Sequence, residues 1–131
     1  MKKVTKTMKA KTRAKKNVDG NVRVVNILGT DYTIEEKTVK EDTKLENSEG
    51  YCDPSIKKIV VLRESEGGLL EAGDFEKVKQ ATIIHETLHA FLFESGINDN
   101  ALKGVEELVV EWMALQLPKI VKTFKELGVL E

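Results

Sequence analysis

The hydrophobic pattern of the chain changes period near residue 73, and this change constrains the fold more than any other feature. Before it, apolar and β-branched residues occur in short runs separated by Gly, Pro and polar segments, a pattern typical of strands. After it, apolar residues recur every three to four positions over long stretches, which indicates helices. Strands followed by helices predict an α+β fold with a small sheet packed on a helix.

Three short runs are predicted as strands of a small, mostly antiparallel sheet of three or four strands. They are rich in Val, Ile, Thr and Tyr and are bounded by turn-forming residues. The first two, 22–28 and 32–39, are joined by a turn at Gly29-Thr30-Asp31. The polar residues 40–50 are predicted to form a loop.

The third run, Lys58–Leu62, has continuously apolar residues from Ile59 onward. Such a run favours a buried, central strand. As an edge strand it could instead bind an extended peptide by backbone pairing.

The first predicted helix runs from Phe75 to Glu94, with Asp74 as its N-cap and Gly96 as its C-terminal stop. A second helix is expected to start near Asp99 or Asn100 and to reach Leu117.

Pro118 is expected to break the second helix, and a last helix should cover 119–127 and end at Gly128. Trp112 lies at helical spacing from Val105 and Leu108, so we expect it in the core.

Charge divides the chain into two parts. Eight of the 21 Lys and Arg residues, and no Asp or Glu, lie within residues 1–16, so the remaining chain carries a formal charge of −9. A block of like charge favours disorder, and we expect residues 1–20 to form a basic tail and residues 21–131 to form the domain. The favoured interpretation of residues 1–16 is a solvated tail, and the alternative is weak binding of nucleic acid through this segment alone.

The sequence offers neither a disulfide nor a membrane-spanning segment, and this limits the class of protein. The single cysteine, Cys52, excludes an intramolecular disulfide and favours a reducing compartment. No apolar run approaches the roughly 18–20 residues of a membrane span. We therefore expect a cytoplasmic protein without a membrane partner.

One motif carries chemistry. His85-Glu86-Thr87-Leu88-His89 lies in the first predicted helix and uses both histidines of the chain. Residues four apart share a helix face with Cβ atoms about 5–6 Å apart, so both imidazoles can bind one Zn²⁺. Glu86 lies about 100° further around the helix, where it can reach a water on the metal. Zinc lowers the pKa of such a water towards ~7, and Glu86 can take its proton.

A catalytic zinc needs a third protein ligand and an open position, and the chain has no third histidine. The candidates are Glu106, Glu107 and Glu111 on the second predicted helix, with Cys52 a less favoured choice. Glu107 and Glu111 share a helix face, whereas Glu106 points among apolar residues. Either Glu106 is a carboxylate held in an apolar face by the metal, or Glu107 and Glu111 line the cleft.

These motifs resemble those of the H-E-x-x-H metallopeptidases called gluzincins. They are more similar still to small zinc peptidases that are often encoded by phages or prophages. In those proteins two or three strands precede T-x-x-H-E-x-x-H-A-x-x-x-x-x-G and an E-x-x-x-E-x-x-A helix. The matching segments here are 82–90 with Gly96, and 107–114, with Gly50-Tyr51-Cys52-Asp53 before the third strand. The similarity covers about residues 22–117.

The resemblance implies a role for each site residue. In gluzincins the first acid of the second helix motif is the third ligand, and the second polar residue steadies a zinc-binding histidine. The implied metal ligands are His85, His89 and Glu107, with Glu86 as the catalytic base. Glu111 would orient His85 or His89 from the outer shell. Because Glu111 stands where Asp or Asn is commonest, it is also an alternative ligand, and Glu106 is the third choice.

We therefore expect a minimal zincin that hydrolyses peptide bonds of a peptide or protein substrate, with Zn²⁺ as cofactor. Tyr51 is expected to help the metal stabilise the oxyanion. The alternative is a non-catalytic binding or regulatory module, of phage or host origin, that is stabilised by its metal.

Overall fold

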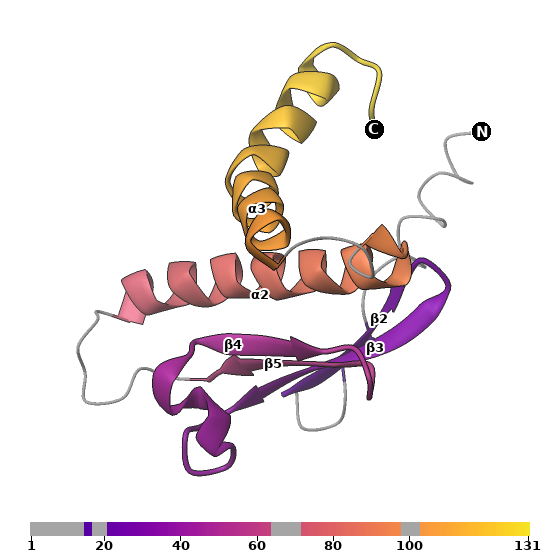
Figure 1. The fold of residues 1–131 in the computed structure, drawn as a ribbon. Helices are drawn as coiled ribbons and strands as arrows, with labels where there is room; N and C mark the ends of the chain where they lie inside the picture. The colour runs from indigo at the N-terminus through magenta and orange to yellow at the C-terminus, as the bar shows by residue number, and fades with distance from the viewer. Residues whose placement is uncertain (1–14, 17–20, 64–71, 98–102) are drawn as a thin grey trace.

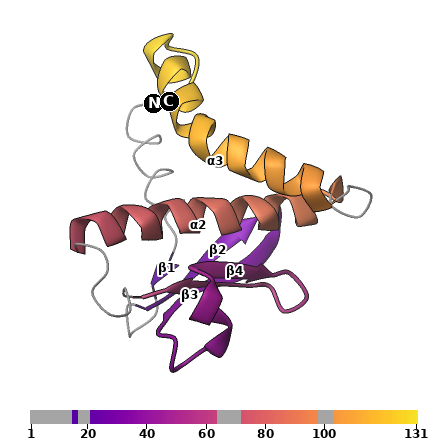
Figure 2. The same cartoon turned by 60° about the vertical axis from the view of Figure 1, so that its left-hand side comes forward.

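The protein has an α+β fold in which a small mixed sheet, helix α2 and helix α3 lie in successive layers (Figure 1). The structure, a computed structural model, describes residues 15–16, 21–63, 72–97 and 103–131. Helix α2 (Ala72–Glu94) lies across one face of the sheet, and α3 (Lys103–Glu126) crosses α2 on the side away from the sheet (Figures 1 and 2). The predicted α+β class is confirmed.

Among the described residues, five strands form the sheet, in the order β1-β2-β3-β5-β4. Three of the four pairings are antiparallel, whereas β3 and β5 run parallel, so the sheet is mixed. The prediction of three or four strands omitted the two-residue strand β1 and did not recognise β4. The strands are β1 (Lys15–Lys16), β2 (Val22–Ile27), β3 (Thr30–Lys37), β4 (Gly50–Asp53) and β5 (Lys58–Leu62).

The hairpin between β2 and β3 turns at Leu28 and Gly29 rather than at Gly29-Thr30-Asp31. Both residues have positive φ, 50° and 94°, as a two-residue type I′ turn requires. Ile27 is therefore paired with Thr30, and β3 ends at Lys37 without including Thr38 or Val39.

The predicted loop 40–50 contains the 3₁₀ helix η1 (Thr43–Asn47), whose Leu45 is buried. It ends in β4, a short strand that pairs with β5. Strand β5 thus lies between β3 and β4, with Ile59, Val60 and Val61 fully buried. The prediction of a central strand is confirmed, and β5 is not the edge at which a peptide could add.

The core lies between the sheet and α2. Its buried residues come from β2, β3, β5 and α2, and they are Ile27, Tyr32, Ile34, Ile59, Val61 and Ala90. Helix α2 begins at Ala72, so Asp74 lies in its first turn and the predicted N-cap is wrong. Gly96 ends the helix as predicted, because its φ of 83° is left-handed and its N–H donates to the Phe93 carbonyl at 3.0 Å.

Helix α3 is continuous through Pro118, so the predicted break there is wrong. A proline removes one backbone donor and strains one turn, but the flanking residues on both sides remain helical. The helix ends at Glu126. Gly128 then adopts φ 74° and donates to Lys125, while Val129 donates to Phe124, which is a Schellman motif.

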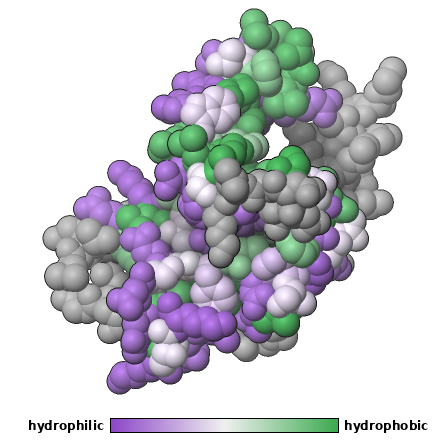
Figure 3. Space-filling view, in the orientation of Figure 1, coloured by the Kyte–Doolittle hydropathy of each residue, from purple (hydrophilic) through white to green (hydrophobic). Residues whose placement is uncertain are grey.

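The prediction that Trp112 is a core residue is also wrong, since 57% of its surface is exposed. Val105 and Leu108 are exposed as well. Helix α3 packs on α2 through the opposite face, where Val110 is fully buried. Figure 3 shows hydrophobic residues gathered on α3.

Several predictions fall wholly or partly outside the described residues. They concern the start of the second helix near Asp99 or Asn100 and most of the basic tail 1–20, of which the structure describes only strand β1. None of the described helices is long and apolar enough to span a bilayer.

Candidate metal centre

Helix α2 presents His85 and His89 on one face, because the two residues are four positions apart. The burial of Leu88 and Ala90 fixes the rotation of this turn of the helix. The Nε2 atoms of the two histidines are 3.3 Å apart, and the rings meet at 61° with their centroids 5.0 Å apart. Both imidazoles therefore direct the same nitrogen towards one point.

Helix α3 brings Glu107 to this point. One carboxylate oxygen of Glu107 is 2.8 Å from Nε2 of His89, and the other is 3.5 Å from Nε2 of His85. Donor atoms of these three residues all lie within 4.8 Å of one another. The structure thus brings together the three residues that the sequence suggested as ligands.

The spacing of these donors suits a small divalent cation. Tetrahedral ligands at about 2.0–2.2 Å from zinc lie about 3.3–3.6 Å apart. The 3.3 Å between the two Nε2 atoms matches this spacing. Glu107 contacts the histidines through different oxygens, one 3.5 Å from His85 and the other at the hydrogen-bond distance of 2.8 Å from His89. Two imidazoles and one carboxylate are a donor set that zinc accepts, as do other divalent ions.

Glu106 also contacts this cluster. Its carboxylate lies 3.1 Å from Nδ1 of His89, and its side chain is 19% exposed. His89 is therefore bonded through both ring nitrogens to consecutive residues of α3. Within the described chain, no hydrogen bond or ion pair joins Glu111 to either histidine, and Glu111 is exposed. The sequence suggested either Glu106 alone or Glu107 together with Glu111. The structure instead places Glu106 and Glu107 at the histidines.

Glu86 lies beside the donors without joining them. Its carboxylate is 4.0 Å from Nε2 of His85, and its side chain is 12% exposed. Burial raises the pKa of the Glu86 carboxyl above its ordinary value, although the neighbouring His85 and His89 oppose the shift. A carboxyl with a raised pKa takes and returns a proton more readily near neutral pH.

Two hollows flank Glu86, and the start of strand β4 borders both. The one beside His85 has a volume of about 410 Å³ and includes Glu49, Val78 and Thr82 in its wall. The one beside His89 has a volume of about 340 Å³ and is lined by Tyr51, Cys52, Pro54 and Phe93, among others. Gly50 and Glu86 line both hollows, so Glu86 separates two parts of one cleft.

Gly50 allows β4 to approach α2 this closely. A Cβ at Gly50 would lie 2.7 Å from Cγ2 of Thr82 and 2.8 Å from the backbone oxygen of Val60. Only a residue without a side chain therefore fits at this position of β4. The neighbouring Thr82 lies one helical turn before Glu86 on α2.

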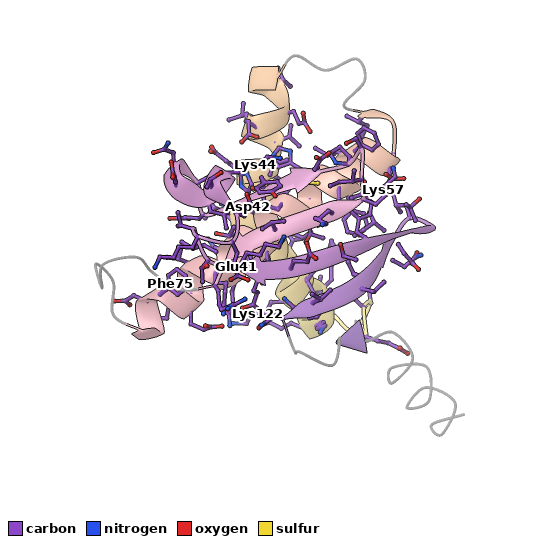
Figure 4. All side chains as sticks on the ribbon, turned by 90° about the horizontal axis from the view of Figure 1, so that it is seen from below. Glu41, Asp42, Lys44, Lys57, Phe75 and Lys122 are labelled. Carbon is purple, nitrogen blue, oxygen red and sulfur yellow. The ribbon has the colours of Figure 1, made fainter. Side chains whose placement is uncertain are left out.

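The hydroxyl of Tyr51, expected to stabilise an oxyanion, donates instead to a carboxylate oxygen of Asp42. Lys44 lies over the Tyr51 ring at 5.0 Å, and Figure 4 shows Asp42 and Lys44 close together at this side of the sheet. Burial and the Asp42 hydrogen bond raise the pKa of Tyr51. The hydroxyl thus stays protonated and donates a charge-assisted hydrogen bond to Asp42, whose pKa this bond lowers.

Cys52 lines the hollow beside His89 but does not belong to the donor cluster. Burial, reinforced by the charge of Glu86, raises the pKa of its thiol to about 12. A thiol with this pKa stays protonated near neutral pH.

The sequence reasoning missed two features of the site, the contact of Glu106 with His89 and the edge strand β4. Glu106 lies four residues before Val110, and a shared face with an apolar residue was a signal that it points towards α2. Strand β4 gave little signal because it is only four residues long and contains Gly and Asp.

Comparison with models of known protein families, with curated proteins and with solved structures gives no match to this chain.

Proposed function

We propose that the protein is a zinc-dependent metallopeptidase of minimal zincin type, which hydrolyses peptide bonds with Glu86 as general base. The observation that carries the proposal is the convergence of His85, His89 and Glu107 within 4.8 Å beside a mostly buried carboxylate at the centre of a cleft. Three protein donors are the number found in catalytic zinc sites.

In this proposal His85, His89 and Glu107 hold the metal. When bound, zinc would supply Lewis acidity, which polarises a carbonyl group and acidifies water. Glu86 takes the proton from the attacking water and delivers it to the leaving amine nitrogen, so that it acts first as base and then as acid.

Strand β4 is the proposed support for the substrate, replacing the earlier candidate β5. Within the described sheet, β4 pairs with β5 alone, so no strand covers its other edge. The Ser48 hydroxyl bonds the N–H and the carbonyl of Gly50, so a peptide that paired with Gly50 would have to displace it. An extended peptide could add there by backbone hydrogen bonds. Because Gly50 borders both hollows, a peptide on this edge would pass Glu86 with side chains entering the cleft on each side.

The test is Glu86→Gln in the full chain, assayed with a library of quenched fluorescent peptides. General base catalysis contributes about 10²–10⁴-fold, so hydrolysis should fall by at least that factor while zinc remains bound at wild-type affinity. Glu111→Gln is the matched control, because it removes one carboxylate that contacts neither histidine. If Glu86→Gln cleaves peptides at the wild-type rate with zinc bound, the proposed mechanism is wrong.

The exposed apolar residues of α3 support the second candidate, a metal-stabilised binding module. Leu108 and Trp112 are exposed on the face opposite Val110, and clustered exposed apolar side chains are typical of interaction surfaces. This candidate predicts that zinc raises the melting temperature while no peptide in the library is cleaved.

A further inference from the structure

We propose that Glu106 is a positioning residue, which orients His89 and thereby sets the affinity of the site for its metal. This inference rests on the metal site of the proposed function and deepens it. The resemblance to gluzincins implied that orienting role for Glu111, which has no hydrogen bond or ion pair with either histidine in the described chain.

The geometry around His89 carries the proposal. Its Nδ1 lies 3.1 Å from the Glu106 carboxylate and its Nε2 lies 2.8 Å from the Glu107 carboxylate. A carboxylate only accepts hydrogen bonds, so Glu106 keeps the proton on Nδ1. By the same rule the Glu107 contact holds a proton on Nε2. A metal bound between Nε2 and Glu107 would replace that proton, and Nε2 would then offer its lone pair while Glu106 keeps the proton on Nδ1. Carboxylates that hold a ligand histidine in this way fix its tautomer and increase its basicity.

The rotation of α3 allows two consecutive acids to reach one ring. Glu106 lies four residues before the buried Val110, on the face that packs on α2. Glu107 is about 100° further round, with 53% of its side chain exposed at the rim of the cluster. Glu106 therefore reaches the inner nitrogen of His89 and Glu107 reaches the outer one.

The two histidines differ in this support. Among the described residues, no hydrogen-bond partner faces Nδ1 of His85, and the His85 side chain is more exposed than that of His89. Glu106 thus orients His89, whereas His85 has no such partner among the described residues. Removal of the Glu106 carboxylate should therefore weaken metal binding.

The experiment measures the zinc affinity of the full chain by competition with a chromogenic chelator. Glu106→Ala should weaken binding by about 10–100-fold, the range typical of lost outer-shell partners. Glu106→Gln, which is nearly isosteric and can still accept from Nδ1, should lose less. Glu111→Ala removes the same charge from the same helix and should stay within about twofold of wild type.

A second measurement separates positioning from a structural role. In the zinc-loaded, ¹⁵N-labelled protein, the Nδ1–H proton of His89 should be observable and slow to exchange in the wild type and in Glu111→Ala. It should be lost in Glu106→Ala, while the circular dichroism spectrum remains unchanged.

Equal zinc affinity of wild type and Glu106→Ala would overturn the assignment, as would an equal loss in Glu111→Ala. If the unmodified chain bound no zinc at all, the proposed function would fail and this inference with it. If the wild type bound zinc and Glu106→Ala bound it with the same affinity, the role of Glu106 would be refuted while the proposed function would still stand.

Discussion

Replacement of Gly50 by alanine should destabilise the protein, because the new Cβ has no space. It would lie 2.7 Å from Cγ2 of Thr82 and 2.8 Å from the backbone oxygen of Val60. The Thr82 side chain is held by its hydrogen bond to the Val78 carbonyl at 2.8 Å, and the Val60 oxygen belongs to the central strand β5. A rotation of Thr82 would break its hydrogen bond to Val78, and a shift of the Val60 oxygen would displace β5.

The magnitude follows from these two contacts. Overpacking of this kind costs roughly 1–3 kcal/mol, and the smaller conformational freedom of alanine in the unfolded chain returns about 0.4–1 kcal/mol. A net loss of about 1–2 kcal/mol should lower the melting temperature by roughly 3–10 °C for a domain of this size. Zinc affinity should change little, because His85, His89 and Glu107 are held by the two helices.

The assay is thermal unfolding followed by circular dichroism, with Gly104→Ala as the control. Gly104 lies near the start of α3 and a Cβ there would meet no atom within 4 Å. Alanine is the better helix former by about 0.5–1 kcal/mol, so this variant should be as stable as wild type or more stable. A melting temperature of Gly50→Ala at or above the wild-type value would refute the steric reasoning.

Two further predictions concern pH and metal. Hydrogen bonds from the Tyr32 hydroxyl at 2.7 Å and from Lys57 at 2.9 Å lower the pKa of Glu94 to about 2. The pKa of Glu94 in the folded protein thus lies below the value of about 4.3 expected in the unfolded chain. The ionised Glu94 therefore contributes its full stabilisation of the fold above about pH 4.3, and this contribution is lost as the pH falls towards 2. Glu94→Gln should therefore be less stable than wild type near neutral pH. Urea unfolding at a series of pH values should show that the difference shrinks between about pH 4 and pH 2, and a constant difference would contradict the assignment. The polar side-chain contacts that join α3 to the rest of the described chain all run to His85 and His89, and metal binding is coupled to folding at such sites. Removal of zinc by a chelator should speed amide hydrogen exchange in α3 more than in α2, and added zinc should reverse the effect; equal exchange with and without the metal would argue against this coupling.

The elements predicted correctly are those fixed by local pattern. The long apolar-periodic segment around the histidines became α2, and Gly96 ended it because a left-handed φ suits glycine. The continuous apolar run of Lys58–Leu62 became the central strand, since both faces of that strand are covered.

Two of the incorrect or missed predictions depended on contacts between distant segments. Trp112 follows a helical apolar pattern, but its face of α3 has no neighbour in the described fold. Strand β4 forms because β5 offers an edge beside it, although its four residues have weak strand preference. Pro118 is a local difference: proline removes one backbone hydrogen bond, but helical residues on both sides keep α3 continuous to Glu126.

At the candidate metal centre, the sequence alone determined that His85 and His89 share a face and that Glu86 lies beside them. That result follows from the geometry of one helix, which needs no tertiary contact. Which carboxylates complete the cluster was decided only by the tertiary structure. The crossing of α3 over α2 and the burial of Val110 set the rotation of α3, and this rotation brings Glu107 to the two Nε2 atoms and Glu106 to Nδ1 of His89, leaving Glu111 exposed.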